Sequence, residues 1–316
     1  MALYFPGRMW YGMRNIDMQV CIAGVTFKNP VTTASGTFSA MDSGRFYEIT
    51  RLGAVITKGV APAAWEGNAT PRIAESYGGM LNSVGLQNPG VDRFIEEDLA
   101  YLRNFDVPVI ANVVGKSIGE YCEVVEKLNE TSVAMMEINI SCPNIKEGGI
   151  SFGTDAKMAA ELTKQVKKAS KKPLILKLTP NAGNIAEIAK AVESEGADCI
   201  SLFNTLLAMR IDVHKRRPVL ANIMGGLSGP AIKPVALRMV YQVRRAVDVP
   251  VIGLGGIMTG EDAAEFLMAG ADAVSVGTAA LINPTAPVEI IDGLERYMEE
   301  QGFRSIQELK ESYTES

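Results

Sequence analysis

The feature that most constrains the fold is an eightfold alternation of short apolar segments with segments of helical spacing. The apolar segments, each expected to form a strand, are residues 31–36, 54–59, 107–114, 133–140, 173–178, 198–203, 249–254 and 272–276. The expected helices are residues 45–52, 92–103, 117–128, 155–170, 184–195, 233–247, 260–268 and 286–301. Near-continuous apolar strands are typical of a parallel sheet covered on both faces. This pattern predicts an α/β protein with a closed (β/α)8 TIM barrel. An open doubly wound sheet is the alternative, but eight regular repeats favour closure.

The segments outside this repeat are also informative. Residues 18–27 are expected to form an N-terminal hairpin that plugs one end of the barrel, with Gly24 at its turn. Long loops are expected after strands 2, 4 and 6, and because they follow strands they belong to the catalytic end and could form a lid. Residues 1–17 are interpreted as an N-terminal extension. With no low-complexity linker, residues 1–316 are predicted to form a single domain.

Composition and charge exclude several classes of protein. A hydrophobic content of 47% and a charged content of 21% are typical of a globular protein with a large core. The net charge is -5 without a basic block, so nucleic acid is not an expected partner. No apolar run approaches about 18 residues, and the N-terminus lacks the pattern of a secretory signal. We therefore expect a cytoplasmic protein that neither binds nucleic acid nor spans a membrane.

The cysteines and the histidine limit the possible chemistry. The four cysteines are Cys21, Cys122, Cys142 and Cys199, and none lies in a C-x-x-C pair. A metal site is therefore not expected, and reduced thiols in an intracellular protein are the simplest interpretation. The single histidine, His214, nearly excludes a histidine-based triad and is expected to be exposed in a basic loop. General base catalysis then falls to Cys, Lys, Asp, Glu or Tyr.

Polar and small residues recur where the expected strands end. They are Ser35, Lys58, Asn112, Asn139, Cys142, Lys177, Asn204, Thr205, Gly255, Gly256, Gly277 and Thr278. In a barrel these ends converge on one site. Glycine pairs are often only turn residues, but pairs after both strands 7 and 8 favour a phosphate site. Lys177 lies within an apolar strand, so it either extends its ammonium to water or faces a ligand that gains negative charge, such as a reduced flavin. Lys58 has a similar context.

Carboxamides and one thiol complete the candidate site. Asn82, Asn139, Asn144 and Asn204 could match a planar ligand with alternating C=O and N–H edges, although asparagine also favours turns for its own local hydrogen bonds. Cys142 follows a strand that Pro143 ends, and is flanked by polar residues. It is either a structural thiol or a base or nucleophile. Cys199, inside an expected strand, is interpreted as structural.

Three motifs resemble dihydroorotate dehydrogenase of class 1. They are Asn-Ile-Ser-Cys-Pro-Asn at 139–144, Asn-Ser-Val-Gly-Leu-Gln-Asn at 82–88 and Gly-Gly-Leu-Ser-Gly-Pro-Ala-Ile-Lys-Pro at 225–234. The resemblance extends from about residue 20 to about residue 309. Cysteine at 142 is similar to class 1, whereas the membrane-bound class 2 has serine there. The sequences of 225–234 and 148–155 are more similar to subclass 1B than to the fumarate-using subclass 1A.

This resemblance implies an enzyme that binds FMN and oxidises (S)-dihydroorotate to orotate in pyrimidine (UMP) biosynthesis. Cys142 would take the C5 proton while C6 gives a hydride to the flavin N5. The implied substrate-binding residues are Lys58, Asn82, Val84, Gly85, Leu86, Asn139, Asn144, Asn204 and Thr205. The implied FMN-binding residues are Ser35, Lys58, Gly59, Asn112, Asn139, Lys177, Phe203, Gly229, Gly255, Gly256, Gly277 and Thr278. Phe203 and Gly229 rest on the resemblance alone.

Subclass 1B also implies an electron-transfer partner. That subunit would carry FAD and a 2Fe-2S cluster, form an α2β2 heterotetramer around a homodimer of this chain, and reduce NAD+. The chain has no G-x-G-x-x-G opening a βαβ unit and no cysteine cluster, so it is not expected to reduce NAD+ alone. The alternatives are a fumarate-dependent enzyme of the 1A type, a related dihydropyrimidine oxidoreductase, and a barrel that binds flavin without catalysis.

Overall fold

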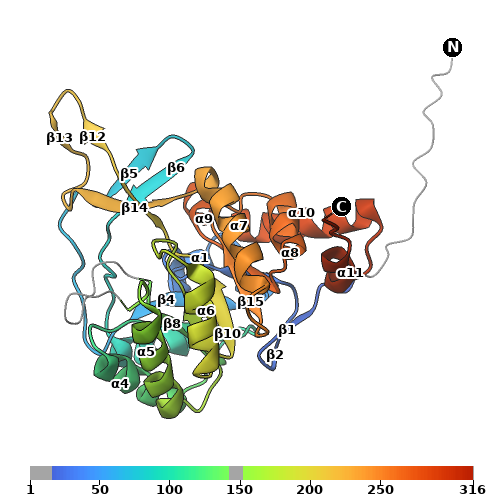
Figure 1. Ribbon diagram of the computed structural model, residues 1–316, viewed down its shortest axis with the longest axis horizontal. Coiled ribbons are helices and arrows are strands. Elements are labelled where there is room, and N and C mark those ends of the chain that lie inside the picture. The colour runs from blue at the N-terminus through green and yellow to red at the C-terminus, as the bar shows by residue number, and fades with distance from the viewer. Residues whose placement is uncertain (1–15, 142–151, 316) are drawn as a thin grey trace.

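The computed structural model describes residues 16–141 and 152–315, which form a parallel eight-stranded barrel surrounded by helices (Figure 1). The barrel strands are β3 (Val31–Thr33), β4 (Val55–Val60), β7 (Val109–Val113), β8 (Met135–Asn139), β9 (Leu174–Lys177), β10 (Cys199–Leu202), β15 (Val251–Leu254) and β16 (Ala273–Val276). Their order is β3-β16-β15-β10-β9-β8-β7-β4. A parallel bridge between Thr32 and Ala54 joins β3 to β4. The (β/α)8 TIM barrel predicted from the strand and helix repeat is therefore confirmed.

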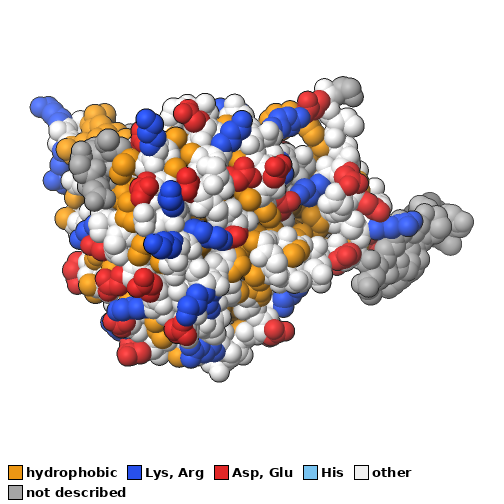
Figure 2. Space-filling model, turned by 60° about the horizontal axis from the view of Figure 1, so that its bottom comes forward, with side chains coloured by type: hydrophobic (Ala, Val, Ile, Leu, Met, Phe, Trp, Pro, Cys, Tyr) orange, Lys and Arg blue, Asp and Glu red, His pale blue; other side chains and the backbone are white. Residues whose placement is uncertain are grey.

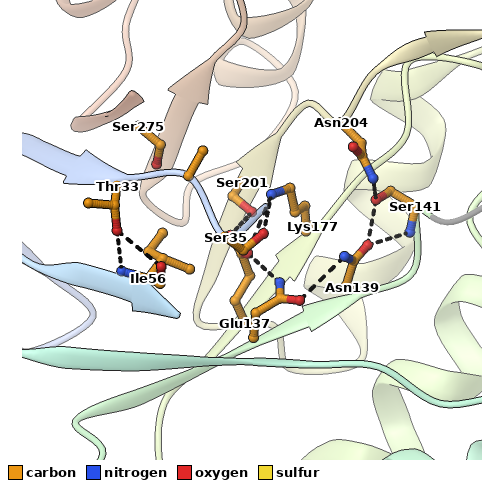
Figure 3. Close-up of polar contacts among 12 residues, drawn as sticks. Thr33, Ser35, Ile56, Glu137, Asn139, Ser141, Lys177, Ser201, Asn204 and Ser275 are labelled. Atoms are coloured by element: carbon orange, nitrogen blue, oxygen red, sulfur yellow. Dashed lines mark hydrogen bonds and ion pairs between the residues drawn. The ribbon is translucent and has the colours of Figure 1, made fainter. Parts of the chain in front are cut away.

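The junction of β3 and β4 depends on a side chain. Thr33 Oγ1 donates a hydrogen bond to the Ile56 carbonyl (3.0 Å) and accepts one from the Ile56 N–H (2.9 Å), as Figure 3 shows. The Gly53 N–H donates to the Val31 carbonyl at 2.9 Å. These contacts satisfy buried backbone groups where regular strand pairing is short.

Helices cover the outside of the barrel, each with one buried face. Those that match the expected repeat are α4 (Ile118–Asn129), α5 (Ala156–Ala169), α6 (Ile185–Ser194), α7 (Lys233–Arg244), α8 (Gly260–Met268) and α10 (Ala286–Gln301). Helices α4, α5, α6 and α8 begin with a side-chain cap, and at α8 Thr259 and Asp262 form a reciprocal capping box. On the face seen in Figure 2, acidic and basic side chains are interspersed, without a continuous basic area.

Two helix predictions are wrong in detail. Residues 45–52 do not form a helix; the structure has the short α1 (Ala40–Ser43) and a single 3₁₀ turn, η1 (Ile49–Arg51). The predicted helix over 92–103 is a continuous helical segment with a π-helical centre, made of α2 (Val91–Arg93), η2 (Phe94–Leu99) and α3 (Ala100–Leu102). Both Phe94 and Leu99 are buried, and the wide π turn places residues five apart on one face. The 3.6-residue period of an α-helix does not predict two buried residues at a spacing of five. The short helices α9 (Thr278–Ile282) and α11 (Ile306–Glu311) were not predicted.

The predicted N-terminal hairpin is confirmed. Strands β1 (Val20–Ile22) and β2 (Val25–Phe27) pair antiparallel, and Ala23 and Gly24 both have positive φ, as a two-residue hairpin turn requires. Ile22 and Phe27 are fully buried against the amino ends of the barrel strands. The hairpin therefore closes the end of the barrel opposite the polar strand ends.

The long excursions predicted after strands 2 and 6 are present, and both contain strands that were not predicted. These are β5 (Ile73–Ser76), β6 (Gly79–Asn82), β11 (Leu206–Met209) and β14 (Met224–Ser228), in one antiparallel sheet of order β11-β14-β6-β5. A small pair, β12 (Ile211–Asp212) and β13 (Arg217–Pro218), extends from it (Figure 1). The pairing of β6 with β14 joins segments that are remote in sequence, so local pattern does not reveal it. Most of the loop after strand 4 lies outside the described residues.

Two negative findings apply to the described residues only. No helix in residues 16–141 and 152–315 is long and apolar enough to cross a membrane. Nor do these residues contain a group of three or more His, Cys, Asp or Glu side chains arranged to hold a metal ion.

The hairpin plug gives a test of how the barrel is stabilised. Replacing Phe27 with Ala should lower the free energy of unfolding by about 3–5 kcal/mol, because a fully buried aromatic ring leaves a cavity. Urea denaturation measures this change. Tyr77→Ala is the control, because Tyr77 is 102% exposed and its loss should cost less than about 0.5 kcal/mol. Equal stability of the two variants would contradict the role of the plug.

Candidate active site

A cavity of ≈ 810 Å³ lies at the carboxyl ends of the barrel strands and is also lined by the four-stranded sheet. Its size is within the range of cofactor and substrate sites. Every candidate site residue that lies in the described ranges lines it: Ser35, Lys58, Gly59, Asn82, Val84, Gly85, Leu86, Asn112, Asn139, Lys177, Phe203, Asn204, Thr205, Gly229, Gly255, Gly256, Gly277 and Thr278. Cys142 and Asn144 lie outside the described residues. The structure thus brings the described candidates together, while their individual roles remain predictions.

One part of the cavity is lined by closely packed backbone. Gly229, Gly255 and Gly256 have φ of 105°, 127° and 85°. A Cβ on Gly256 would lie 2.9 Å from the Gly229 carbonyl oxygen, so a side chain does not fit there. Thr278 Oγ1 donates to Ser228 Oγ at 2.8 Å, which ties the loop after β16 to β14. Loops after β14, β15 and β16 therefore meet in a surface of backbone suited to an anion.

A buried ion pair lies under the cavity. Lys177 Nζ is 3.5 Å from Glu137 Oε1, with the two side chains only 5% and 1% exposed. Lys177 also donates to Ser35 Oγ at 3.1 Å (Figure 3). Lys177 does not extend to bulk water, so the first alternative from the sequence is wrong for this residue. Its ammonium is held beside the cavity by a carboxylate.

Glu137 is a site residue that sequence reasoning missed. Its Oε1 accepts from Asn112 Nδ2 at 2.6 Å, and its Oε2 accepts from Ser201 Oγ at 2.8 Å. A signal was present: Glu137 is a single carboxylate within an otherwise apolar strand, between Met136 and Ile138. A buried charge in that position has to be paired, and its partners came from strands whose order the sequence did not reveal.

Two predicted carboxamides are joined through Ser141, which was also missed. Asn139 Oδ1 accepts from Ser141 Oγ (2.5 Å) and from the Ser141 N–H (3.2 Å). Asn204 Nδ2 donates to Ser141 Oγ at 2.6 Å (Figure 3). Asn139 Nδ2 donates to Asn112 Oδ1 at 3.4 Å. Both contacts between Asn139 and Ser141 are local, but the Asn204–Ser141 and Asn139–Asn112 contacts cross between strand ends. These asparagines therefore do more than shape turns.

The segment 83–88 borders the cavity from the β6 side. Asn68 holds its backbone, donating from Nδ2 to the Ser83 carbonyl (2.8 Å) and from its N–H to the Val84 carbonyl (3.0 Å). Gly85 and Leu86 both have positive φ. Ser83 Oγ is buried and has no hydrogen-bond partner within the described structure. Asn82, at the end of β6, donates to the Gly226 carbonyl at 3.5 Å.

Lys58 differs from Lys177 in its surroundings. A register shift between Ile56 and Gly59 interrupts the pairing of β4 with β7, and Lys58 lies within it. Its side chain is exposed and lines the cavity. Within residues 16–141 and 152–315 it has no carboxylate partner for an ion pair. A β-bulge often redirects a side chain towards a functional site, and here it leaves a cation at the cavity.

The three described thiols are not candidates for the base. Burial raises the pKa of the Cys199 thiol well above its usual range, and the nearby carboxylate of Asp272 raises it further. Burial also raises the pKa of Cys122, and Cys21 is exposed on β1. None of these three cysteines lines the cavity. The interpretation of Cys199 as a structural thiol agrees with this environment, and His214 is exposed as expected.

Comparison with known proteins gives the family. The model of the dihydroorotate dehydrogenase family matches residues 17–298. The catalytic subunit of dihydroorotate dehydrogenase B (NAD(+)) from Alkaliphilus metalliredigens (strain QYMF) is 60% identical over 301 residues, covering 95% of this chain and 100% of the relative. The subunits of that name from Alkaliphilus oremlandii (strain OhILAs) and Geobacter sulfurreducens (strain ATCC 51573 / DSM 12127 / PCA) are 57% and 52% identical, each over 94% of this chain, covering 99% and 98% of the relatives. By this similarity, on a barrel whose cavity collects the predicted residues, the chain belongs to the dihydroorotate dehydrogenase family.

Proposed function

We propose that this protein is an FMN-dependent oxidoreductase that converts (S)-dihydroorotate to orotate in UMP biosynthesis, with NAD+ as the final acceptor. The observation that carries the proposal is the meeting of three features in one cavity: a backbone-lined anion site, a buried lysine and a set of carboxamides. The names of the relatives describe the same reaction type in similar proteins. We further propose that it works in the cytoplasm.

The residues present fit FMN. The closely packed glycines leave room for a phosphate against backbone, with Gly229, Gly255, Gly256, Gly277 and Thr278 as its proposed ligands. Ser35, Lys58, Gly59, Asn112, Asn139, Lys177 and Phe203 are the proposed ligands of the ring system. When bound, FMN supplies the hydride acceptor for the reaction. The Lys177 ammonium would favour the negative charge that the ring gains on reduction.

The substrate would be held by polar groups at the cavity. Lys58 has no carboxylate partner in the described structure, which leaves its charge for the carboxylate of dihydroorotate. Asn82, Asn139, Asn144, Asn204 and Thr205 would bind the ring edges, with Val84, Gly85 and Leu86 alongside. Carboxamides suit this ligand because each offers two N–H donors and one acceptor oxygen.

Cys142 is the proposed base. It would take a proton from C5 of dihydroorotate while a hydride leaves C6, so the carbon–carbon bond becomes double and orotate forms. Cys142 directly follows Ser141, which is joined to both Asn139 and Asn204. The buried Cys199 is an unsuitable base because the raised pKa of its thiol disfavours the thiolate.

We also propose a partner subunit. The relatives are named as catalytic subunits, and the described residues of this chain contain no group of ligands for a metal centre. The proposed partner carries FAD and a 2Fe-2S cluster and forms an α2β2 complex around a homodimer of this chain. It would take electrons from FMN to NAD+.

The first test uses the purified chain without its partner. Anaerobic addition of dihydroorotate should bleach the yellow colour of bound FMN, and NAD+ alone should not restore it, because the electron path to NAD+ is missing. Absorbance near the flavin band measures both steps. A yellow protein that does not bleach would contradict the proposal that dihydroorotate is the substrate. Rapid recovery of colour with fumarate would contradict the NAD+ route and favour the fumarate-dependent alternative.

The second test addresses the base. Cys142→Ala should slow flavin bleaching by about 10²–10⁴-fold near pH 7, the usual contribution of a general base. Cys142→Ser should recover part of the rate as pH rises, because a hydroxyl loses its proton less readily than a thiol. Stopped-flow absorbance measures these rates. Cys21→Ala is the control because Cys21 is exposed and does not line the cavity. A Cys142→Ala variant as fast as this control would rule out the assignment.

The third test addresses the anion site. Gly256→Ala should weaken FMN binding by about tenfold or more, because a Cβ at φ of 85° would press on the Gly229 carbonyl and strain the loop. Fluorescence titration of the protein stripped of FMN measures the dissociation constant. Gly183→Ala is the matched control, since nothing lies within 4 Å of its added Cβ. Equal FMN affinity of both variants would show that the loop of Gly256 is not part of the site.

A further inference from the structure

Glu137 of β8 is buried in the barrel and is in contact with side chains from three other barrel strands. Its carboxylate meets Asn112 of β7 at 2.6 Å, Ser201 of β10 at 2.8 Å and Lys177 of β9 at 3.5 Å. A buried ion pair is seldom more stable than apolar residues of similar volume, because both charges lose their hydration. Stability alone therefore does not account for a glutamate here, and two of its three partners, Asn112 and Lys177, line the cavity.

The charge of Glu137 determines which way the Asn112 amide points. A carboxylate only accepts hydrogen bonds, so Asn112 has to turn its NH₂ group towards Glu137. The Asn112 oxygen is then directed to Asn139, whose NH₂ group lies 3.4 Å away. Oxygen and nitrogen of an amide are otherwise hard to tell apart, and here the charged neighbour decides between them.

The same alternation of hydrogen-bond donors and acceptors continues from Asn139 through Ser141 to Asn204. With its NH₂ group towards Asn112, Asn139 offers its oxygen to the Ser141 N–H, which can only donate (3.2 Å), and to Ser141 Oγ (2.5 Å). Because Ser141 Oγ donates there, it accepts from Asn204 Nδ2 at 2.6 Å (Figure 3). The Glu137 carboxylate at one end of this series of hydrogen bonds and the Ser141 N–H at the other therefore require the same orientation of the Asn112 and Asn139 amides. One N–H of Asn139 and the oxygen of Asn204 are left without partners among the described residues, and both residues line the cavity.

We propose that Glu137 is a positioning residue with two effects on the site. It sets the donor and acceptor order of Asn112, Asn139 and Asn204, and so favours a ligand edge in which a carbonyl lies beside an N–H. It also compensates the charge of Lys177, so that this buried ammonium is not left without a counter-charge. The identity of the ligands, FMN and a dihydropyrimidine, rests on the proposed function, whereas the network itself does not.

The test compares the FMN-loaded wild-type protein with Glu137→Gln, which keeps the shape and removes the charge. The uncompensated Lys177 should favour the more negative, reduced FMN, and raise by at least tenfold the ratio of the oxidised to the reduced dissociation constant. For two electrons, that is a midpoint potential about 30 mV higher. Orotate should bind at least tenfold more weakly, because a glutamine can present either N–H or oxygen to Asn112. Dithionite titration and fluorescence titration measure the two quantities.

Ser201→Ala is the matched control, because it removes a hydrogen bond to the same carboxylate and keeps the charge and the contact to Asn112. Its potential should equal that of the wild type and its orotate affinity should stay within threefold. If Glu137→Gln matches Ser201→Ala in both quantities, Glu137 has only a structural role and the proposal is overturned.

A second variant covers the case in which Glu137→Gln does not retain FMN. Glu137→Asp keeps the charge but withdraws the carboxylate from Asn112, so it should keep the potential and weaken orotate binding. Wild-type affinity for orotate in that variant would overturn the proposal. The potential is measured with dithionite and does not depend on dihydroorotate. A wild-type protein that dihydroorotate fails to reduce would therefore count against the proposed function alone.

Discussion

The site depends on closure of the barrel between β3 and β4. Only a closed barrel brings the ends of β3 and β9 to a common cavity, where Ser35 and Lys177 meet. At this junction regular pairing is reduced to a bridge, and the Thr33 hydroxyl supplies two hydrogen bonds to Ile56 in its place. A side chain that both donates and accepts is required there, because the two groups that it satisfies are a carbonyl and an N–H.

The two ends of the barrel differ in polarity and in their contribution to the protein. At the amino end, Ile22 and Phe27 of the hairpin meet the apolar strand starts, and this closed end supplies stability through burial. At the carboxyl end, the strands finish in lysines, asparagines and glycines around a cavity. Polar groups at that end are compatible with folding because the apolar end and the surrounding helices provide the core. A rigid barrel then holds the polar groups in fixed relative positions.

The polar groups under the cavity act as one connected network. Glu137 links Lys177 to Asn112, and Ser141 links Asn139 to Asn204. In a low-dielectric interior such a network is favourable only if each member has its partners. Its members come from several strands, and Asn112, Asn139, Lys177 and Asn204 also line the cavity.

Much of this protein could be inferred from the chain alone. Near-continuous apolar runs predicted the barrel strands, because a parallel strand that is buried on both faces is apolar along its whole length. The N-terminal hairpin was predicted with Gly24 at its turn, and Lys58, Lys177 and the asparagines were predicted from their places at strand ends. These features have in common that their physical cause lies within a few residues of the chain.

The features that the sequence did not reveal depend on partners that are distant in the chain. The glycine-rich β14 is a strand because it pairs with β6, more than a hundred residues away in the chain. The π-helical turn from Phe94 to Leu99 depends on what that segment packs against. In the sequence, Glu137 is an isolated carboxylate in an apolar segment, and its partners Lys177, Asn112 and Ser201 are known only from the structure. The sequence by itself determined the repeat of strands and helices and the residues at the strand ends, since local periodicity and turn chemistry specify them. Only the tertiary structure decided which charges and amides face one another, because those contacts form between strands after the barrel closes.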